Sequence, residues 1–500
     1  MQGINLKYKK MKKTIFFSLL VLGLFFIISK ISFAQWQPEV RLTNDPTSSY
    51  TSFGNARCIA ADGNVIHVVW YDGATVNAGN WEIYYKRSTD KGLTWSSNVN
   101  LSNNEFLSYN PAIAVSGSYV HVAWYDNRNG NWEEYYKRST DGGITWGTEI
   151  RLTNKPTGSG HPSIAASGLN VHLVFYDNRD GNYEIYYKRS VDGGDNWSSD
   201  IRLSNNAGMS TFPSVAVSGS AVHVAWYDST AGNWEIYYKR STNGGINWGA
   251  DTRLTNNSAA STLPTLAVSG SNVHIVWVDN RNGIENIYYK RSTNGGSKWG
   301  VDTKLTTNKK YWESYPSIAV NGSVLHLVYY SWPTNNYEII YKTSVNDGVS
   351  WGNAVQLTNN PAASSIPSIA VSGSSVHVIF RDTRDGNCEI YYKQYKSSAK
   401  ILTDITNNNP ELPKVYSLEQ NYPNPFNPET KISFNIAKTG FVSLKIFDAL
   451  GREVSTLVND VKEPGSYSVD FNGSELTSGV YFYRLQSVEF TDTKRMLMIK

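Results

Sequence analysis

The sequence predicts an all-β protein: a seven-bladed β-propeller followed by a small second unit. Three observations lead to this fold class. One strand pattern recurs seven times, residues near the N-terminus supply the piece that the last copy lacks, and the composition suits short strands. Aromatic residues reach 13% and glycines number 39, whereas charged residues are only 18%. Such a composition favours many short strands joined by tight turns.

Each copy of the repeat carries a histidine at the same place, at spacings of 54, 51, 51, 51, 52 and 51 residues. These are His67, His121, His172, His223, His274, His326 and His377. In the second copy we predict four strands, A to D, at 112–115, 120–125, 133–138 and 149–153, with turn-forming Gly-Ser, Asn-Gly and Asp-Gly pairs between them. Strands B and C are apolar on both faces, so neighbouring sheets must cover both sides. Four short antiparallel strands repeated seven times predict a propeller.

The two ends of the repeat region predict how the ring closes. The seventh copy has strands A, B and C and then loses the pattern near residue 395. Residues 36–44 (WQPEVRLTN) match residues 146–154 (WGTEIRLTN), which contain strand D of the second copy. We therefore expect the N-terminal segment to form strand D of the last blade and to pair an otherwise open edge.

The N-terminus reads as an export signal. A basic start at Lys12 and Lys13, an apolar run over 14–28 and a small-x-small site at 32–34 predict a secretory signal peptide over 1–34. These 34 residues hold six lysines and no acid, so the remainder has 40 basic and 42 acidic residues, a balance of −2. We expect no nucleic-acid partner, because that needs a clustered basic face, and no membrane span after signal cleavage. The expected divisions are then 35–396 for the propeller, 397–413 for a polar linker and 414–500 for the second unit.

Six predicted C–D turns share the pattern Ser-x-Asp/Asn-x-Gly-x-x-Trp. The Asx side chain can bond nearby backbone N–H groups, glycine accepts positive φ, and tryptophan packs the hairpin on the blade. The Asx residues are Asp90, Asp141, Asp192, Asn243, Asn294 and Asn346, and the tryptophans are Trp95, Trp146, Trp197, Trp248, Trp299 and Trp351. Over residues 36–395 the pattern resembles the Asp boxes, or BNR repeats, of sialidase-like propellers. The resemblance implies a structural role for these residues, and asparagine at three of them agrees with it.

The resemblance of the Asp boxes does not extend to the catalytic residues of sialidases. The resemblance implies three arginines for a sialic acid carboxylate, a Tyr–Glu nucleophile pair and an Asp acid/base. Arg57, in the corresponding region of the first copy, falls at the proline position of the other copies rather than at the family's arginine position. The other arginines and the Tyr–Glu pair have no counterpart that we can place. We therefore predict no catalytic residues; if the protein is an enzyme, a sialidase-like glycoside hydrolase is expected.

Candidate ligand residues lie in the B–C loops, on the face that the resemblance implies for ligands. Four loops repeat Asp-x-Arg, with Arg128, Arg179, Arg281 and Arg384, and aromatic residues such as Trp132 and Trp234 start strand C. Aromatic platforms beside Asp and Arg could stack on sugar rings and bond hydroxyl groups. Alternatively, the aromatics pack between blades and each arginine pairs with the neighbouring aspartate.

Blade six departs from the repeat in two loops of that same face. Tyr311, Trp312 and Glu313 replace small polar residues, and Trp332 lies in a B–C loop that lacks the Asp-x-Arg pattern. We predict that this aromatic cluster is the main ligand contact; a local hydrophobic plug is the alternative.

No cofactor and no metal site are expected. The seven histidines lie one strand away from the axis, so they cannot converge on one ion, and we expect them to pack between blades. Cys58 and Cys388 should lie near one face of neighbouring blades, where a ring-closing disulfide is possible.

The C-terminal segment resembles the type A sorting domain of the type IX secretion system. The resemblance rests on NYPNPFNP at 421–428 and SGVY at 478–481 and covers about residues 414–500. It implies a small Ig-like β-sandwich recognised by the type IX machinery at the outer membrane. The protein is then secreted by, or attached to the surface of, a Gram-negative bacterium.

Together these features predict an exported propeller that binds a glycan or a cell-surface protein without catalysis. An exo-sialidase-type hydrolase and a structural or adhesive surface component are the alternatives. The sequence does not identify the ligand.

Overall fold

The computed structural model describes residues 35–54, 56–73, 80–307, 312–332, 336–396, 415–474, 476–487 and 489–499. The predicted signal peptide (1–34), the predicted linker (397–413) and Tyr311 lie outside these residues. The chain divides into two compact units, residues 1–400 and 401–500. Throughout the described ranges the regular structure is β-strand, and no helix long and apolar enough to cross a membrane occurs in them.

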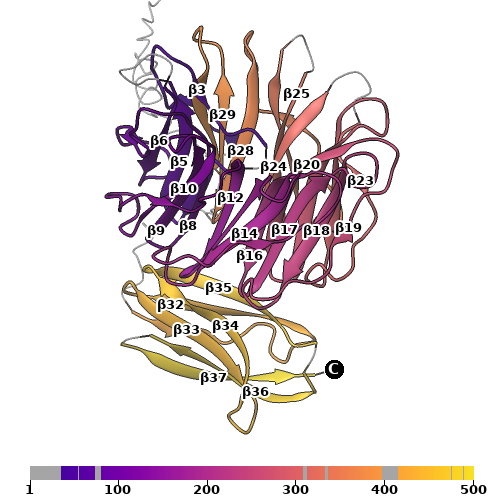
Figure 1. Cartoon of the computed structure of the whole chain (residues 1–500). Helices are drawn as coiled ribbons and strands as arrows, with labels where there is room; N and C mark the ends of the chain where they lie inside the picture. The colour runs from indigo at the N-terminus through magenta and orange to yellow at the C-terminus, as the bar shows by residue number, and fades with distance from the viewer. Residues whose placement is uncertain are drawn as a thin grey trace, which may run out of the picture. The chain divides into compact units, whose positions relative to one another are not determined.

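The first unit is a ring of seven antiparallel sheets, which confirms the predicted propeller (Figure 1). Strand A, the innermost of each sheet, is split in blade one into β3 (Ser49–Tyr50) and β4 (Ile59–Asp62). In the other blades it is β8 (Ser108–Ser116), β12 (Ser159–Ser167), β16 (Ser210–Ser218), β20 (Ser261–Ser269), β24 (Glu313–Asn321) and β28 (Ser364–Ser372). Strand B is β5 (Val65–Asp72), β9 (Tyr119–Asp126), β13 (Asn170–Asp177), β17 (Ala221–Asp228), β21 (Asn272–Asp279), β25 (Val324–Ser331) and β29 (Ser375–Asp382).

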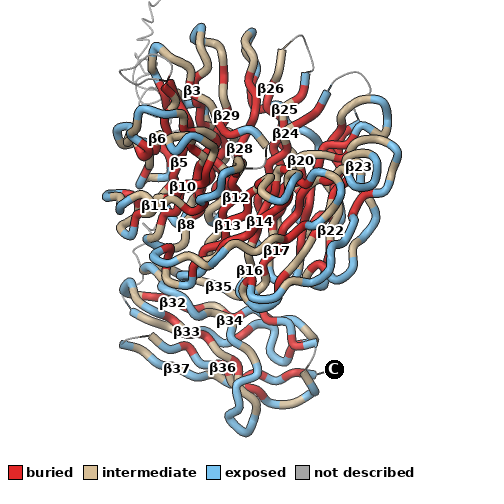
Figure 2. Tube along the Cα trace, in the orientation of Figure 1, coloured by how far each residue is buried: buried red, intermediate tan, exposed pale blue. Residues whose placement is uncertain are grey.

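Strands C and D complete each sheet on the outside. Strand C is β6 (Glu82–Ser88), β10 (Glu133–Ser139), β14 (Glu184–Ser190), β18 (Glu235–Ser241), β22 (Asn286–Ser292), β26 (Glu338–Ser344) and β30 (Glu389–Lys396). Strand D is short: β7 (Val99–Asn100), β11 (Ile150–Arg151), β15 (Ile201–Arg202), β19 (Thr252–Arg253), β23 (Thr303–Lys304) and β27 (Val355–Gln356). Strands B and C are buried along most of their length, as their apolar faces predict (Figure 2).

The N-terminal segment closes the ring as predicted. β1 (Gln35–Trp36) and β2 (Val40–Arg41) pair antiparallel with β30, Trp36 opposite Tyr395 and Val40 opposite Tyr392. The last sheet thus receives its fourth strand from the start of the mature chain, and its edge is not left open.

A repeated contact joins each blade to the next. In blade one, His67 Nδ1 lies 2.7 Å from the Tyr85 hydroxyl, and burial lowers the pKa of His67 to about 4, so the ring is neutral. The Tyr85 ring meets the Asp-box Trp146 of blade two edge-on, with ring centroids 4.8 Å apart. The other six pairs have centroid distances of 4.9 to 5.3 Å: Tyr136–Trp197, Tyr187–Trp248, Tyr238–Trp299, Tyr289–Trp351, Tyr341–Trp36 and Tyr392–Trp95. Trp36 therefore replaces the Asp-box tryptophan that the seventh blade lacks.

Both cysteines are free thiols in the structure, so it does not contain the disulfide that the sequence left open. Cys58 is buried at the inner end of blade one, where its sulfur accepts the Ser52 N–H at 3.2 Å. Burial raises the pKa of Cys58 to about 11, which leaves the thiol protonated and unreactive at neutral pH.

The second unit is a small β-sandwich, as the resemblance implied. One sheet contains β31 (Ser417–Leu418), β32 (Glu429–Ile436) and β35 (Gly465–Asn472). The other contains β34 (Glu453–Lys462), β33 (Gly440–Phe447), β36 (Gly479–Gln486) and β37 (Thr491–Met498). Alternate side chains such as Ile432, Phe434 and Tyr483 fill the core between them.

We predict that Trp36→Ala lowers the free energy of unfolding by about 2 kcal/mol, because it removes a half-buried ring from Tyr341 and Tyr395. Urea unfolding of the mature chain, followed by circular dichroism, measures the change. Val301→Ala, at a site 84% exposed between β22 and β23, is the control and should leave the unfolding midpoint unchanged. Equal midpoints for both variants would contradict the closing role of Trp36.

Candidate functional site

The Asp boxes form closed turns. In blade two, Asp141 Oδ1 lies 2.6 Å from Ser139 Oγ and accepts the N–H groups of Ile144 and Thr145 at 3.0 and 2.9 Å. The same geometry at Asp90, dominated by hydrogen bonds from Thr94, lowers the pKa of that carboxyl to about 2. Asn243 makes the turn with its amide oxygen, which accepts the Asn247 N–H at 2.9 Å. All these contacts lie within the turn itself, which fits a structural role.

The four Asp-x-Arg arginines lie between carboxylates of their own blade. Arg128 Nη2 is 2.6 Å from Asp126, its Nη1 bonds Glu149 of the outer edge, and its guanidinium lies 4.3 Å from the Tyr135 ring centroid. These neighbours raise the pKa of Arg128. The same ion-pair and ring contacts recur at Arg179, Arg281 and Arg384. Their N–H groups donate to carboxylates of the same blade, so few of these donors remain for a ligand.

A hollow of about 480 Å³ opens at the mouth of the ring; we call it the bowl. Its lining is almost wholly aromatic or aliphatic and comes from blades one to six. It consists of Phe53, Asn110, Tyr125, His161, Phe212, Tyr227, Thr262, Leu263 and Tyr315. Among these described residues there is no carboxylate and no permanent cation.

A backbone irregularity repeated in strand A points these side chains at the axis. The residue before each strand-A proline has positive φ, from 46° to 55°: Asn110, His161, Phe212, Leu263, Tyr315 and Ile366. The pairing of strands A and B shifts register at the same point, for example between Tyr109 and Ala112. Such a bulge turns a side chain out of the sheet, and positive φ at residues other than glycine often marks a functional position. Sequence reasoning missed these residues, although in copies two to seven this position always differs while the proline after it is always present.

The polar groups of the bowl hold its wall in place. Asn110 Nδ2 lies 3.1 Å from the Tyr125 hydroxyl and 3.4 Å from His161 Nδ1. The His161 ring is 4.3 Å from Phe212 and 5.1 Å from Tyr176, centroid to centroid. Burial lowers the pKa of His161 to about 4, so at neutral pH this imidazole is an uncharged hydrogen-bonding group on an aromatic wall.

The floor of the bowl is an insertion in blade one, which we call the plug: residues 51–57, of which Asn55 lies outside the described residues. Thr51 Oγ1 donates to Ile366 O in blade seven at 2.8 Å, and Ser52 Oγ donates to Pro111 O in blade two at 2.6 Å. The Phe53 N–H donates to Asn110 Oδ1 at 3.1 Å. The plug thus joins blade one to its neighbours, blades seven and two, and its Gly54 lies against the Phe212 ring of blade four across the ring. Phe53 of the plug lines the bowl, and Arg57 lines the central channel.

Arg381 is a cation beside the bowl. It replaces the tyrosine found at this place in most blades, and its guanidinium lies 5.2 Å from the Phe53 ring and 5.5 Å from the Tyr50 ring. Its Nε donates to Ser365 Oγ at 2.9 Å. The terminal nitrogens have no carboxylate partner among the described residues.

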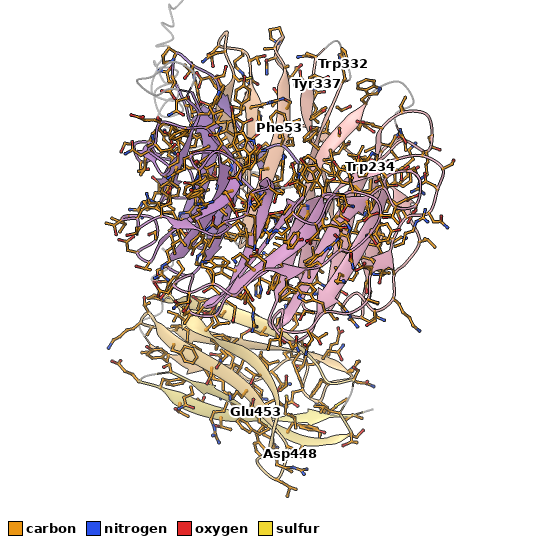
Figure 3. The ribbon with its side chains drawn as sticks, viewed as in Figure 1. Phe53, Trp234, Trp332, Tyr337, Asp448 and Glu453 are labelled. Carbon is orange, nitrogen blue, oxygen red and sulfur yellow. The ribbon has the colours of Figure 1, made fainter. Side chains whose placement is uncertain are left out.

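The rim over blade six carries two of the predicted ligand residues. Trp312 is 55% exposed and Trp332 is 40% exposed. Ring contacts lead from Trp332 to Tyr337 at 5.3 Å, from Tyr337 to Tyr330 at 4.9 Å, and from Tyr330 to the bowl residue Tyr315 at 5.5 Å. Figure 3 labels Phe53, Trp332 and Tyr337 on the propeller.

Other predicted residues lie deeper. Trp132 meets Tyr125 edge-on at 5.1 Å and Trp234 meets Tyr227 at 5.0 Å, so both support the bowl wall from behind. Glu313 is only 5% exposed at the start of β24, and burial raises its pKa to about 7. The predicted surface contact through Glu313 is therefore not available in this structure.

Sequence reasoning also missed Glu134 in β10. The other six blades have isoleucine at its place: Ile83, Ile185, Ile236, Ile287, Ile339 and Ile390. Glu134 is fully buried, and neither carboxyl oxygen has a hydrogen-bond partner among the described residues. Burial, reinforced by Asp177 and Glu133, raises its pKa well above the usual range.

Comparison with known proteins agrees with this architecture. Residues 25–225 match the family model described as a BNR repeat-like domain, and residues 420–500 match that of a secretion system C-terminal sorting domain. A sialidase of Clostridium perfringens is 26% identical over 160 residues, which cover 25% of this chain and 42% of the sialidase. The chain thus spans less than half the length of that relative.

Two solved structures are similar in shape. The polysaccharide lyase Uly1 has a TM-score of 0.50 at 8% identity, covering 72% of this chain and 99% of that one. The endosialidase of phage phi92 has a TM-score of 0.47 at 10% identity, covering 93% and 87%. At such low identity the likeness to the lyase shows a shared fold and nothing more.

The first unit is therefore a sialidase-like BNR-repeat propeller. The second unit is a C-terminal sorting domain, so the protein is exported by type IX sorting to the cell surface or beyond it.

We predict that Glu134→Ile raises the free energy of unfolding at neutral pH by about 2 kcal/mol, because it replaces an unpaired buried carboxyl with the residue of the other blades. The folded-state pKa of Glu134 is raised, so the group's contribution is fully present below its unfolded-state pKa of about 4.5 and is lost as pH rises toward the folded-state value. The advantage of the variant should grow between about pH 5 and pH 8.

Urea unfolding across that pH range tests this, with Glu134→Gln as the control that keeps the shape but cannot ionise. Parallel pH profiles for wild type and both variants would show that Glu134 is not a buried, protonated acid.

Proposed function

We propose that the propeller is a non-catalytic glycan-binding module whose ligand occupies the bowl. The observation that carries the proposal is the bowl itself: a concave aromatic surface of about 480 Å³ on the axis, with amide, imidazole and hydroxyl groups between the rings. Aromatic faces stack on the apolar faces of sugar rings, and neutral polar groups bond sugar hydroxyls.

The residues that line the bowl favour binding over hydrolysis. Glycoside hydrolysis needs a pair of carboxyl groups, or a tyrosine with its glutamate, on either side of the scissile bond. The described lining residues contain no carboxylate. Among the described residues the arginine that contacts a bowl ring is Arg381, against Phe53, whereas the sialidase resemblance implies three arginines around one carboxylate.

The exposed tryptophans over blade six extend the site outward. Trp332 connects to the bowl through Tyr337, Tyr330 and Tyr315, and Trp312 precedes β24 in the same blade. A glycan that enters the bowl with one end would meet these rings with its next residues. The proposed ligand is therefore an oligosaccharide rather than a single sugar.

A glycan array probed with the mature chain tests this function. Phe53→Ala removes the floor ring and should weaken binding of any captured glycan about tenfold, the loss expected for one stacked aromatic ring. The double variant Trp312→Ala, Trp332→Ala should weaken long glycans more than short ones. Val301→Ala, exposed away from the bowl, is the control. An array with no bound glycan, or binding unchanged in the Phe53 and tryptophan variants, would overturn the proposal.

A second candidate, a sialidase-type hydrolase, is favoured by the match to the Clostridium perfringens sialidase. A fluorogenic sialoside decides between the two. We expect no turnover above the uncatalysed rate from the mature chain. Robust turnover that is lost in Phe53→Ala would assign hydrolysis to the bowl and replace the binding proposal.

A further inference from the structure

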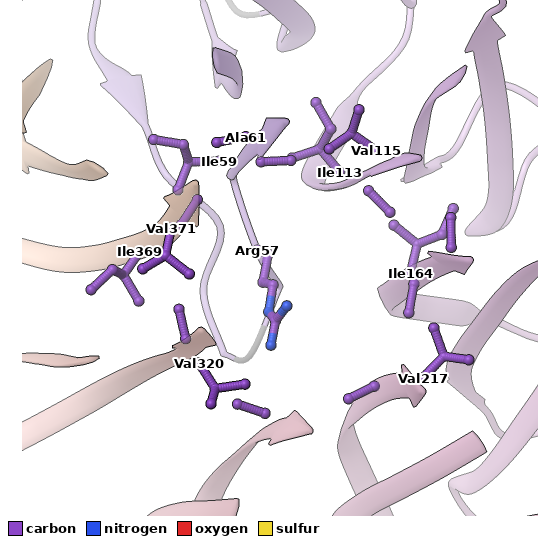
Figure 4. Close-up of a pocket in the computed structure, with 18 of the residues that line it drawn as sticks. Arg57, Ile59, Ala61, Ile113, Val115, Ile164, Val217, Val320, Ile369 and Val371 are labelled. Atoms are coloured by element: carbon purple, nitrogen blue, oxygen red, sulfur yellow. The ribbon is translucent and has the colours of Figure 1, made fainter. Parts of the chain in front are cut away.

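The central channel beneath the plug is a second, separate cavity. It measures about 240 Å³ and is lined by strand-A side chains of all seven blades. These are almost all aliphatic, among them Ile59, Ile113, Ile164, Val217 and Val320 (Figure 4). In such surroundings a charged group loses its hydration and needs a partner.

Arg57 places a cation among the aliphatic side chains of this channel. It stands where the other copies have proline, and Figure 4 shows its side chain pointing into the space between the aliphatic residues. Its Nη2 donates to the Leu266 carbonyl of blade five at 2.6 Å, so the side chain reaches across the axis. Among the described residues this carbonyl is its one hydrogen-bond acceptor, and no carboxylate lies opposite.

The guanidinium remains charged despite this environment. Burial lowers the pKa of Arg57, with no acid nearby to offset the effect. Arginine nevertheless stays protonated in proteins at neutral pH, so the channel carries one positive charge. A guanidinium has five N–H donors, and among the described residues only one of those of Arg57 has an acceptor, the Leu266 carbonyl.

We propose that the channel binds a small monovalent anion against Arg57. One charge in an aliphatic cavity matches one opposite charge; a sulfate or phosphate dianion would keep an uncompensated charge in the channel, and a metal cation would be repelled. A halide or nitrate fits a cavity of about 240 Å³. The anion neutralises the cation that ties the plug to blade five and so stabilises the plug.

Bromide is the probe, because it can be located by its anomalous scattering. Crystals of the mature chain grown in sodium bromide should show an anomalous peak in the channel in contact with the Arg57 guanidinium. In solution, bromide should raise the melting temperature in a saturable way, by about 3 °C at 100 times Kd. Sodium gluconate, whose anion carries hydroxyl groups that aliphatic side chains cannot bond, keeps the ionic strength constant.

Variants separate this site from general salt effects. Arg57→Met should lose both the anomalous peak and the bromide-dependent rise, and Arg57→Lys should keep them. Arg452→Met, an exposed arginine of the second unit, is the control and should respond as the wild type does.

No bromide beside Arg57 in wild-type crystals that hold bromide elsewhere would overturn the proposal, since the channel then holds water only. The same bromide response in Arg57→Met and wild type would also overturn it. If Arg57→Met does not fold, the wild-type anomalous map decides alone. Glycan binding in the bowl is independent of this result.

Discussion

The structure depends on one contact, the edge of an Asp-box tryptophan against a tyrosine of the preceding blade. The tyrosine is fixed from behind by a neutral histidine, and the tryptophan is fixed by the Ser–Asx turn that carries it. Every blade supplies the tryptophan of the contact with the preceding blade and the tyrosine of the contact with the next blade. A ring of seven blades therefore needs seven tryptophans. The boxes supply six and Trp36 supplies the last, so fold closure rests on a residue far from the boxes in sequence.

Because these contacts between blades do not involve strand A, the residues of that inner strand can differ from blade to blade. In four blades an arginine of the B–C loop pairs with carboxylates of the same blade, as Arg128 does with Asp126 and Glu149, and fixes that loop. The bulge before each strand-A proline then presents a single side chain to the axis, and there the copies differ, from Asn110 to Leu263. Near-identical blades can in this way build an asymmetric site, since stability and recognition use different positions of the same repeat.

The sequence predicted the fold well and the site only in part, for physical reasons. Seven copies fix strand register by comparison, and the match of residues 36–44 to 146–154 fixes closure. The role of Arg128 was not evident from the sequence, because it depends on an ion pair with Glu149. The two side chains meet only when strands C and D pair. Trp312 and Trp332 stand out in the sequence because they depart from the repeat, and both are exposed in the structure; their contact with a ligand stays a prediction. Phe212 and His161 could not, since only the bulge, a tertiary feature, turns them toward the axis.

The plug explains why one propeller can hold two unlike cavities. A symmetric ring would enclose one continuous channel from face to face. The blade-one insertion crosses that path, presents Phe53 to the bowl on one side and directs Arg57 into the channel on the other. The glycan that we propose for the bowl would therefore meet the Phe53 ring and not the buried Arg57. Arg57 bonds Leu266 on the channel side of the plug, whereas the proposed recognition depends on the rings of the bowl. Since the plug is also the insertion that breaks the symmetry of the repeat, both cavities originate in the same few residues of blade one.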